Sequence, residues 1–248
     1  MNKVYKINIT KNFDFSIYSD ETLLNIMNEY NKITYKDRNK ILYLQQQDFF
    51  KVPHVEFSYL WGKEKVFYAF SSKLFKVLDT NLADTSLQIH QLKTEKYYCL
   101  NNDTVITDMT NSIKCKKGEF VNIPNNTIHS LSKGSRVFEE QDNLIFDNAE
   151  TIRINDKLNR KVSTPQEYVK YLLPQFLKKI SKDSLLNYDG ENNKFIFIAD
   201  GEVEIECNNK KLILNEKEEL YYLSKQVKIN KVKGYVRIIE CEFYKLGD

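Results

Sequence analysis

Four polar side chains that could bind a metal ion or transfer a proton lie within eight residues of the stretch SLQIHQLKTEKYY. Gln88, His90, Lys93 and Glu95 follow one another at spacings of two, three and two residues. Because side chains alternate along a strand, Gln88 and His90 point to the same face, and Glu95 joins them after a bend. A further candidate, His129, follows a Pro/Asn turn later in the chain.

Together these side chains offer a mixed set of ligand atoms. Two imidazole nitrogens, a carboxylate oxygen and an amide oxygen suit a borderline divalent ion. We therefore predict that Gln88, His90, Glu95 and His129 bind a divalent metal, zinc in the first place, with manganese, iron or cobalt as alternatives. A site with open coordination positions is catalytic rather than structural. The alternative is that these histidines are ordinary packed or surface residues of strands, although the chain has only three histidines.

The elements that must position these residues are short and rich in β-branched and aromatic residues. Such segments recur at about ten-residue spacing, which is typical of a sandwich, barrel or jelly roll. Two helices are also predicted, over residues 19–32 and 163–180, the second with a Thr-Pro start and a proline that divides it. The predicted strands span residues 55–61, 65–70, 73–78, 86–90, 96–100, 104–109, 119–123, 136–140, 194–199, 203–207, 211–214, 219–223 and 236–243.

The strand-rich pattern occurs twice, at an offset of about 99 to 100 residues. The second copy places Lys194 where the first has Glu95, and Ile229 where the first has His129. A metal site in the first copy would therefore have no counterpart in the second. We expect four regions, which are an N-terminal extension with one helix (1–55), a metal-binding barrel (56–160), a linking helical segment (161–184) and a second, ligand-free barrel (185–248).

Composition excludes several classes of protein. With 42% hydrophobic and 13% aromatic residues the chain can form a substantial core. A net charge of +3 is too small to indicate nucleic acid or a membrane as a partner. The four cysteines are far apart, form no CxxC and are expected to be buried thiols, which together with the absence of a signal-peptide pattern predicts a cytoplasmic location.

Several motifs, in order, carry a resemblance to a known family. The chain has WG at 61–62, SLQIHQLKTEKY where that family has SLQxHxxRxEHW, and IPNNTIHSL where it has IPxGTxHRL. It also has EEQ at 139–141 for EVQ, and ETIRINDKLNR at 150–160 for DDIxRxxDxYGR. Residues 61–160 thus resemble the cupin isomerase domain of type II mannose-6-phosphate isomerases, found at the C-terminus of bifunctional mannose-1-phosphate guanylyltransferase enzymes.

The resemblance implies a mainly β fold, a double cupin of two jelly-roll β-barrels with a few helices. It implies a metal-dependent aldose–ketose isomerase of a phosphorylated sugar, with mannose 6-phosphate as the first candidate. The family's metal ligands fall on the four positions named above, and its catalytic arginine falls on Arg160. Lys93 is expected to contact substrate, because its family counterpart is basic. Glu139 is a candidate general base, or else an outward-facing carboxylate in solvent.

The departures from the family pattern keep other functions open. Lys93 replaces an arginine, Lys96 and Tyr97 replace a histidine and a tryptophan, and Asn125 or Asn126 must take the left-handed turn of a glycine. The alternatives are a non-catalytic sugar- or metal-binding regulatory cupin, or another metal-cupin enzyme such as a nucleotide-sugar epimerase or dioxygenase. The expected partner is a small sugar phosphate, with a homodimer as one option for the assembly.

Overall fold

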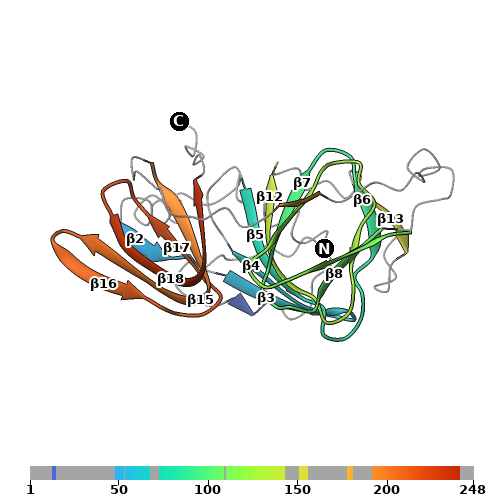
Figure 1. Ribbon diagram of the computed structural model, residues 1–248, viewed down its shortest axis with the longest axis horizontal. Coiled ribbons are helices and arrows are strands. Elements are labelled where there is room, and N and C mark those ends of the chain that lie inside the picture. Colours follow the sequence, from blue (N-terminus) through green and yellow to red (C-terminus); the bar gives the residue numbers. More distant parts are fainter. Residues whose placement is uncertain are drawn as a thin grey trace, which may run out of the picture.

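The computed structural model of the chain describes residues 13–14, 48–52, 54–67, 73–108, 110–142, 151–155, 178–180 and 192–240. All regular structure in these residues is β, arranged as two curled units side by side (Figure 1). Among the described residues, no helix is long and apolar enough to cross a bilayer. The helix predicted over 19–32 lies outside these residues. Of the helix predicted over 163–180, residues 163–177 also lie outside the described residues, and the prediction is wrong for Lys178–Ile180, which form strand β14.

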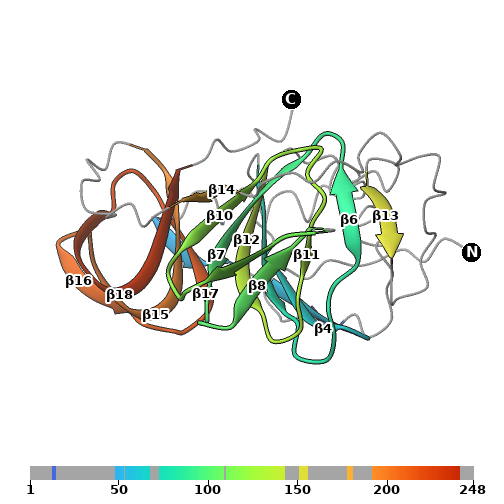
Figure 2. The same ribbon diagram turned by 45° about the vertical axis from the view of Figure 1, so that its right-hand side comes forward.

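The first unit, here called the first barrel, contains the predicted metal-binding segment. Its main sheet has the strand order β1-β3-β4-β5-β12-β7-β10-β14, and the sheets β11-β8-β9 and β13-β6 complete it (Figure 2). Its strands are β1 (Phe13–Asp14), β3 (His54–Tyr59), β4 (Gly62–Phe67), β5 (Lys73–Asp79), β6 (Leu87–His90), β7 (Thr94–Cys99), β8 (Thr104–Thr107), β9 (Ser112–Cys115), β10 (Phe120–Ile123), β11 (Ser130–Leu131), β12 (Arg136–Asp142), β13 (Thr151–Asn155) and β14.

The second unit, here called the second barrel, is built around two long strands. Strands β15 (Lys194–Cys207) and β18 (Lys228–Glu240) pair along almost their whole length. Strands β16 (Lys210–Leu214) and β17 (Glu219–Leu223) pair with opposite halves of β15. Strand β2 (Phe49–Lys51) pairs with β17, although in the sequence it lies between β1 and β3 of the first barrel, within the segment expected to be an extension. The second barrel therefore consists of four strands that follow the first barrel in the sequence and one, β2, that lies between two strands of the first barrel.

Strand alternation gives the main sheet of the first barrel two buried faces. On β12, Val137 and Glu139 point into the barrel, while Phe138 and Glu140 point toward the second barrel. Inside the first barrel lies an apolar cluster that includes Trp61, Leu78, Tyr97, Cys99, Ile106, Cys115, Val121, Ile123, Leu131 and Val137. The second barrel has its own internal cluster, which includes Ile196, Ile198, Val203, Ile205, Tyr221, Leu223, Val236 and Ile238.

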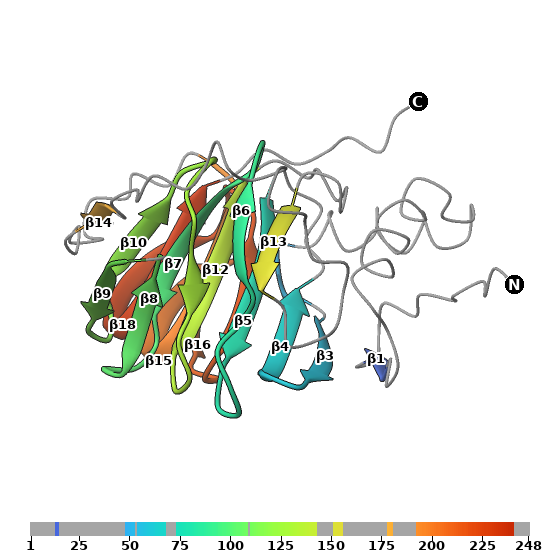
Figure 3. The same ribbon diagram turned by 90° about the vertical axis from the view of Figure 1, so that its right-hand side faces the viewer.

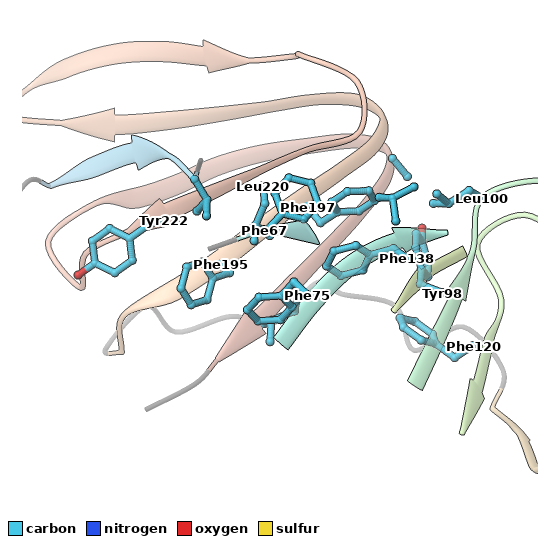
Figure 4. Close-up of a cluster of buried hydrophobic side chains, with 14 residues drawn as sticks. Phe67, Phe75, Tyr98, Leu100, Phe120, Phe138, Phe195, Phe197, Leu220 and Tyr222 are labelled. Carbon is cyan, nitrogen blue, oxygen red and sulfur yellow. The ribbon is translucent and has the colours of Figure 1, made fainter. Parts of the chain in front are cut away.

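A third cluster, here called the interbarrel core, joins the two barrels. Figure 3 shows β15 and β18 behind β7 and β10, and Figure 4 shows the aromatic rings that meet between them. Phe138 stacks on Phe197 with ring centroids 3.9 Å apart, and Phe75 stacks on Phe138 at 5.9 Å. The core comprises Val52, Phe67, Phe75, Val77, Tyr98, Leu100, Phe120, Phe138, Phe195, Phe197, Ala199, Leu220, Tyr222 and Ile239.

Ion pairs surround the interbarrel core. Arg237 donates two hydrogen bonds to the buried Glu140 carboxylate, at 2.6 and 3.3 Å. Arg136 donates to both carboxylate oxygens of Glu218, at 2.8 and 2.7 Å, and Lys65 pairs with Glu219 at 2.7 Å. Because two-pronged arginine pairs are geometrically specific, these contacts fix how one barrel sits on the other. Strand β7, which carries Glu95, is packed on both faces, through Tyr97 inside the first barrel and through Tyr98 in the interbarrel core.

The predicted cysteine state is confirmed for the part of the chain that the structure describes. Cys99, Cys115 and Cys207 are buried, and none of the three forms a disulfide. Cys99 and Cys115 pack inside the first barrel and Cys207 inside the second. Cys241 lies outside the described residues.

Candidate metal centre

His90 and Glu95 lie at the facing ends of two consecutive strands. His90 is the last residue of β6 and Glu95 the second residue of β7, with a bend at residues 91–92 between the strands. The bend turns both side chains into the first barrel, as the sequence spacing predicted. His90 Nε2 consequently lies 3.1 Å from Glu95 Oε1.

His129 reaches the same place through a backbone bridge and a tight turn. Its N–H donates to Gln88 O at 2.9 Å, and Gln88 N–H donates to His129 O at 3.0 Å. In the preceding turn Asn126 has a φ of 60°, which is the left-handed conformation. The motif that the sequence resembles has a glycine at this position. The N–H of Asn126 donates to His90 O at 2.6 Å, which fastens the turn to the end of β6.

One ligand atom from each of His90, Glu95 and His129 lies within 4.8 Å of the others. His129 Nε2 is 3.1 Å from Glu95 Oε2, opposite the oxygen that faces His90. All three side chains are almost completely buried, with residue exposures of 3%, 3% and 1%. Two imidazole nitrogens therefore face one carboxylate in a space from which water is largely excluded.

The tautomer of His129 indicates what this space is suited to hold. Its Nδ1 lies 3.0 Å from Thr127 O, and because a carbonyl only accepts, Nδ1 carries the hydrogen. The buried Nε2 faces the carboxylate of Glu95, 3.1 Å from Oε2. A neutral imidazole would present its Nε2 lone pair to this carboxylate, an arrangement that a cation bound between the two groups would stabilise, whereas a protonated imidazole would form an ion pair there. Metal-binding histidines usually donate a hydrogen bond from the nitrogen that does not bind the metal, often to a backbone carbonyl, as Nδ1 of His129 does here. These residues therefore fit a divalent metal ion.

Two donors contact the Glu95 carboxylate, one on each oxygen. Lys93 Nζ lies 3.0 Å from Oε1, and the Tyr97 hydroxyl donates to Oε2 at 2.8 Å. Burial opposes the charge on Glu95, but Lys93 and His90 outweigh it and hold the pKa of this carboxyl well below its usual value. The ionised form, which is the form that binds a metal, is therefore the stable one.

The other predicted site residues are placed as follows. Gln88 is half-buried, is tied to His129 through its backbone and accepts a hydrogen bond from Ser86 at 2.9 Å through its side-chain oxygen. Lys93 points at Glu95 and also lies 3.4 Å from Gln141 Oε1. Glu139 faces the barrel interior, so the alternative of a solvated, outward-facing carboxylate is wrong. Arg160 lies outside the described residues.

Glu139 belongs to a buried row of charges that crosses adjacent strands. Lys76 Nζ lies 3.1 Å from Glu64 Oε1 and 3.7 Å from Glu139 Oε1. Burial raises the pKa of Glu139 to about 7, although the Lys76 charge opposes this. Burial also disfavours the charge of Lys76, yet Glu139 and Glu64 raise its pKa above the usual value. Glu139 thus changes protonation near neutral pH.

Arg153 lies in the motif at residues 150–160 that carries part of the family resemblance, but the sequence alone suggested no role for it. Arg153 pairs with Gln88 between β13 and β6, and Thr151 pairs with His90. Directly opposite residues of paired strands project to the same face, so Arg153 lies on the face of Gln88 and His90. Arg153 is 9% exposed, and Thr151 Oγ1 lies 3.1 Å from His90 Nδ1. The alternation of TIRIN was the available signal, but it did not reveal the partner strand.

The comparisons with known proteins agree with this architecture. No protein-family model and no curated protein sequence matches the chain. Among solved structures, mannose 6-phosphate isomerase from Bacillus subtilis is 16% identical with a TM-score of 0.60, and the match covers 77% of this chain and 98% of that one. A zinc-bound mannose 6-phosphate isomerase is 9% identical with a TM-score of 0.57, covering 79% and 100%. A variant of phosphomannose isomerase from Salmonella typhimurium gives the same values.

At these identities the likeness shows the fold alone. The neighbours are mannose-6-phosphate isomerases, and the comparisons do not show the bifunctional guanylyltransferase family to which the motifs pointed. The predicted fold class is confirmed: the chain has a mainly β, double-cupin fold, with a cluster of two histidines and a glutamate in its first barrel.

Proposed function

We propose that the chain is a metal-dependent aldose–ketose isomerase that acts on a phosphorylated sugar. The observation that carries this proposal is the buried cluster of His90, Glu95 and His129 beside Lys93, with the buried Glu139 on the neighbouring strand β12. A cation-binding group, a fixed positive charge and a carboxyl that titrates near neutrality are the three components that the reaction needs. The likeness in fold to mannose-6-phosphate isomerases supports the same reaction class.

The isomerisation moves a proton between adjacent sugar carbons through an enediol. His90, Glu95 and His129, with Gln88 as a fourth candidate, would hold a divalent ion, which supplies positive charge to polarise substrate oxygens. Zinc is the first candidate because of the two imidazoles, with manganese, iron or cobalt as alternatives.

The chain's own charged residues would move the proton and stabilise the negative charge that develops. Glu139 has a pKa of about 7, which is suited to accepting and returning a proton at neutral pH. Lys93 is already placed beside the cluster and would stabilise the enediolate or bind the phosphate. Arg153, on the face of Gln88, and Arg160 are further candidates for that role.

The test is turnover of sugar phosphates by purified chain loaded with Zn²⁺. We expect interconversion of an aldose phosphate and its ketose isomer, loss of this activity in a chelator and its return when Zn²⁺ is added. Lys93→Met should lower the rate, whereas Lys96→Met, on β7 but on the face opposite to Glu95, should leave it unchanged. No turnover of any hexose or heptose phosphate by metal-loaded protein would contradict the proposal. Binding of a sugar phosphate without turnover would instead support the regulatory alternative.

A further inference from the structure

Tyr97 contacts two of the candidate ligands with one side chain. Its hydroxyl donates to Glu95 Oε2 at 2.8 Å in a fully buried position. Its ring meets the ring of His129 nearly edge-on, with centroids 6.3 Å apart and an interplanar angle of 69°. Glu95 and His129 come from different elements, since Glu95 is on strand β7 and His129 is the bridge residue directly before β11. Tyr97 therefore links the positions of two ligands that the backbone does not connect directly.

The hydroxyl of Tyr97 completes the orientation of the Glu95 carboxylate. Lys93 Nζ lies 3.0 Å from Oε1, and Tyr97 is the donor to Oε2. With one donor on each oxygen, the plane of the carboxylate cannot rotate freely about its terminal bond. Each oxygen also faces one imidazole nitrogen at 3.1 Å, so the orientation of the carboxylate sets its position relative to both histidines.

Residues that hold metal ligands in place in this way contribute 10–100-fold, roughly, to metal affinity in other proteins. The motif that the chain resembles has a tryptophan at this position, and tryptophan has no hydroxyl. We propose that Tyr97 is a positioning residue of the metal centre, whose hydroxyl orients Glu95 and whose ring orients His129. This inference rests on the metal centre of the proposed function, but not on the identity of the sugar or on turnover.

The experiment is a Zn²⁺ titration of the full, metal-stripped chain against a competing chelator. Tyr97→Phe removes only the hydroxyl, and we expect its Kd for Zn²⁺ to rise by about 10–100-fold. Tyr97→Leu also removes the ring beside His129, so its Kd should rise further. The matched control is Tyr98→Phe, because Tyr98 is the next residue of β7 and points into the interbarrel core. Its Kd should stay within about twofold of wild type.

Two further measurements separate a positioning role from a merely structural one. The visible absorption bands of bound Co²⁺ depend on ligand geometry, so they should change in Tyr97→Phe and remain unchanged in Tyr98→Phe. The rise in unfolding temperature on addition of Zn²⁺ reports affinity even if a variant is less stable than wild type. That rise should be smaller for Tyr97→Phe.

The outcomes distinguish this inference from the proposed function. If wild type binds Zn²⁺ and Tyr97→Phe binds it equally well, the role of Tyr97 is wrong and the metal centre stands. If wild type binds no Zn²⁺, both are overturned. If Tyr97→Phe binds weakly while wild type shows no isomerase turnover, the positioning role is supported and only the proposed reaction fails.

Discussion

Lys194 occupies in the second barrel the position that Glu95 occupies in the first. Glu95 pairs with Ile123 on one neighbouring strand and Gln141 on the other, and Lys194 pairs with Leu223 and Glu240. The numbers differ by 99 or 100 at every position, so the strand register supports the internal repeat that the sequence suggested. Lys194, like Glu95, is buried. One barrel thus carries a carboxylate where the other carries an amine.

This relationship predicts that the chain binds one Zn²⁺. Among the described residues, the cluster in the first barrel is the one group of histidine and acidic side chains arranged for a metal. We expect Glu95→Met to abolish Zn²⁺ binding, because a thioether cannot replace the charged ligand. Lys194→Met, the equivalent change in the second barrel, should leave the stoichiometry at about one Zn²⁺ per chain. Elemental analysis of both folded variants after dialysis is the measurement. Two zinc ions per wild-type chain would contradict it.

Glu139 should make stability depend on pH. Burial raises its pKa from the ordinary value of 4.5 to about 7 in the folded chain, so between these values the folded chain keeps a proton that the unfolded chain releases. Stability contributed by this proton is therefore present at low pH and is lost as pH rises toward 7. Glu139→Gln should remove this dependence and be more stable than wild type at pH 8, by roughly 1–3 kcal/mol.

Urea unfolding at several pH values measures this effect. Glu202→Gln, a change at a more exposed carboxylate of the second barrel, is the control and should follow the wild-type profile. If Glu139 is also the proton-transfer group, its carboxylate form is needed for activity. The kcat/KM of wild type should then fall as pH is lowered below about 7, the folded pKa of Glu139. A pH-independent difference between wild type and Glu139→Gln would contradict the assignment.

Breaking the ion pair between Arg237 and Glu140 should weaken the contact between the barrels. Glu140 is 2% exposed, so Arg237→Met leaves a buried carboxylate without its two-pronged partner. We expect a loss of about 3–5 kcal/mol in the free energy of unfolding. The double variant Arg237→Met/Glu140→Leu removes both charges and should recover most of that loss. Equal stability of the single and double variants would show that the buried charge is not the cause.

Asn126 should tolerate glycine but not a β-branched residue. At a φ of 60°, Asn126→Gly removes a steric cost, whereas Asn126→Val places a branched side chain in a disfavoured conformation. Asn126→Val should lower the free energy of unfolding by roughly 1–2 kcal/mol. It should also weaken Zn²⁺ binding, because the position of His129 depends on this turn. Asn126→Gly should bind Zn²⁺ as wild type does. Thermal unfolding and the Zn²⁺ titration check both variants. If Asn126→Val binds Zn²⁺ as wild type does, the conformation of this turn does not determine the geometry of the metal centre.

Much of the fold follows from local pattern. Alternating apolar residues and short spacing predicted most strands of both barrels, and the 99–100-residue offset predicted their equivalence. The spacing of His90 and Glu95 predicted that a bend would bring them together, and the structure has that bend. These features depend on the two-residue period of a strand and on turn chemistry, which adjacent residues determine.

What only the tertiary structure decided is which strands meet. Strand β2 joins the second barrel, Arg153 pairs with Gln88, and the hydroxyl of Tyr97 reaches Glu95. Nothing in the local sequence near Phe49–Lys51 distinguishes pairing with β17 from pairing with a neighbour in the chain. Pairing between distant strands is decided by how the closed barrels bury their apolar faces against each other. The sequence by itself determined the candidate ligands, and barrel closure decided which other side chains surround them.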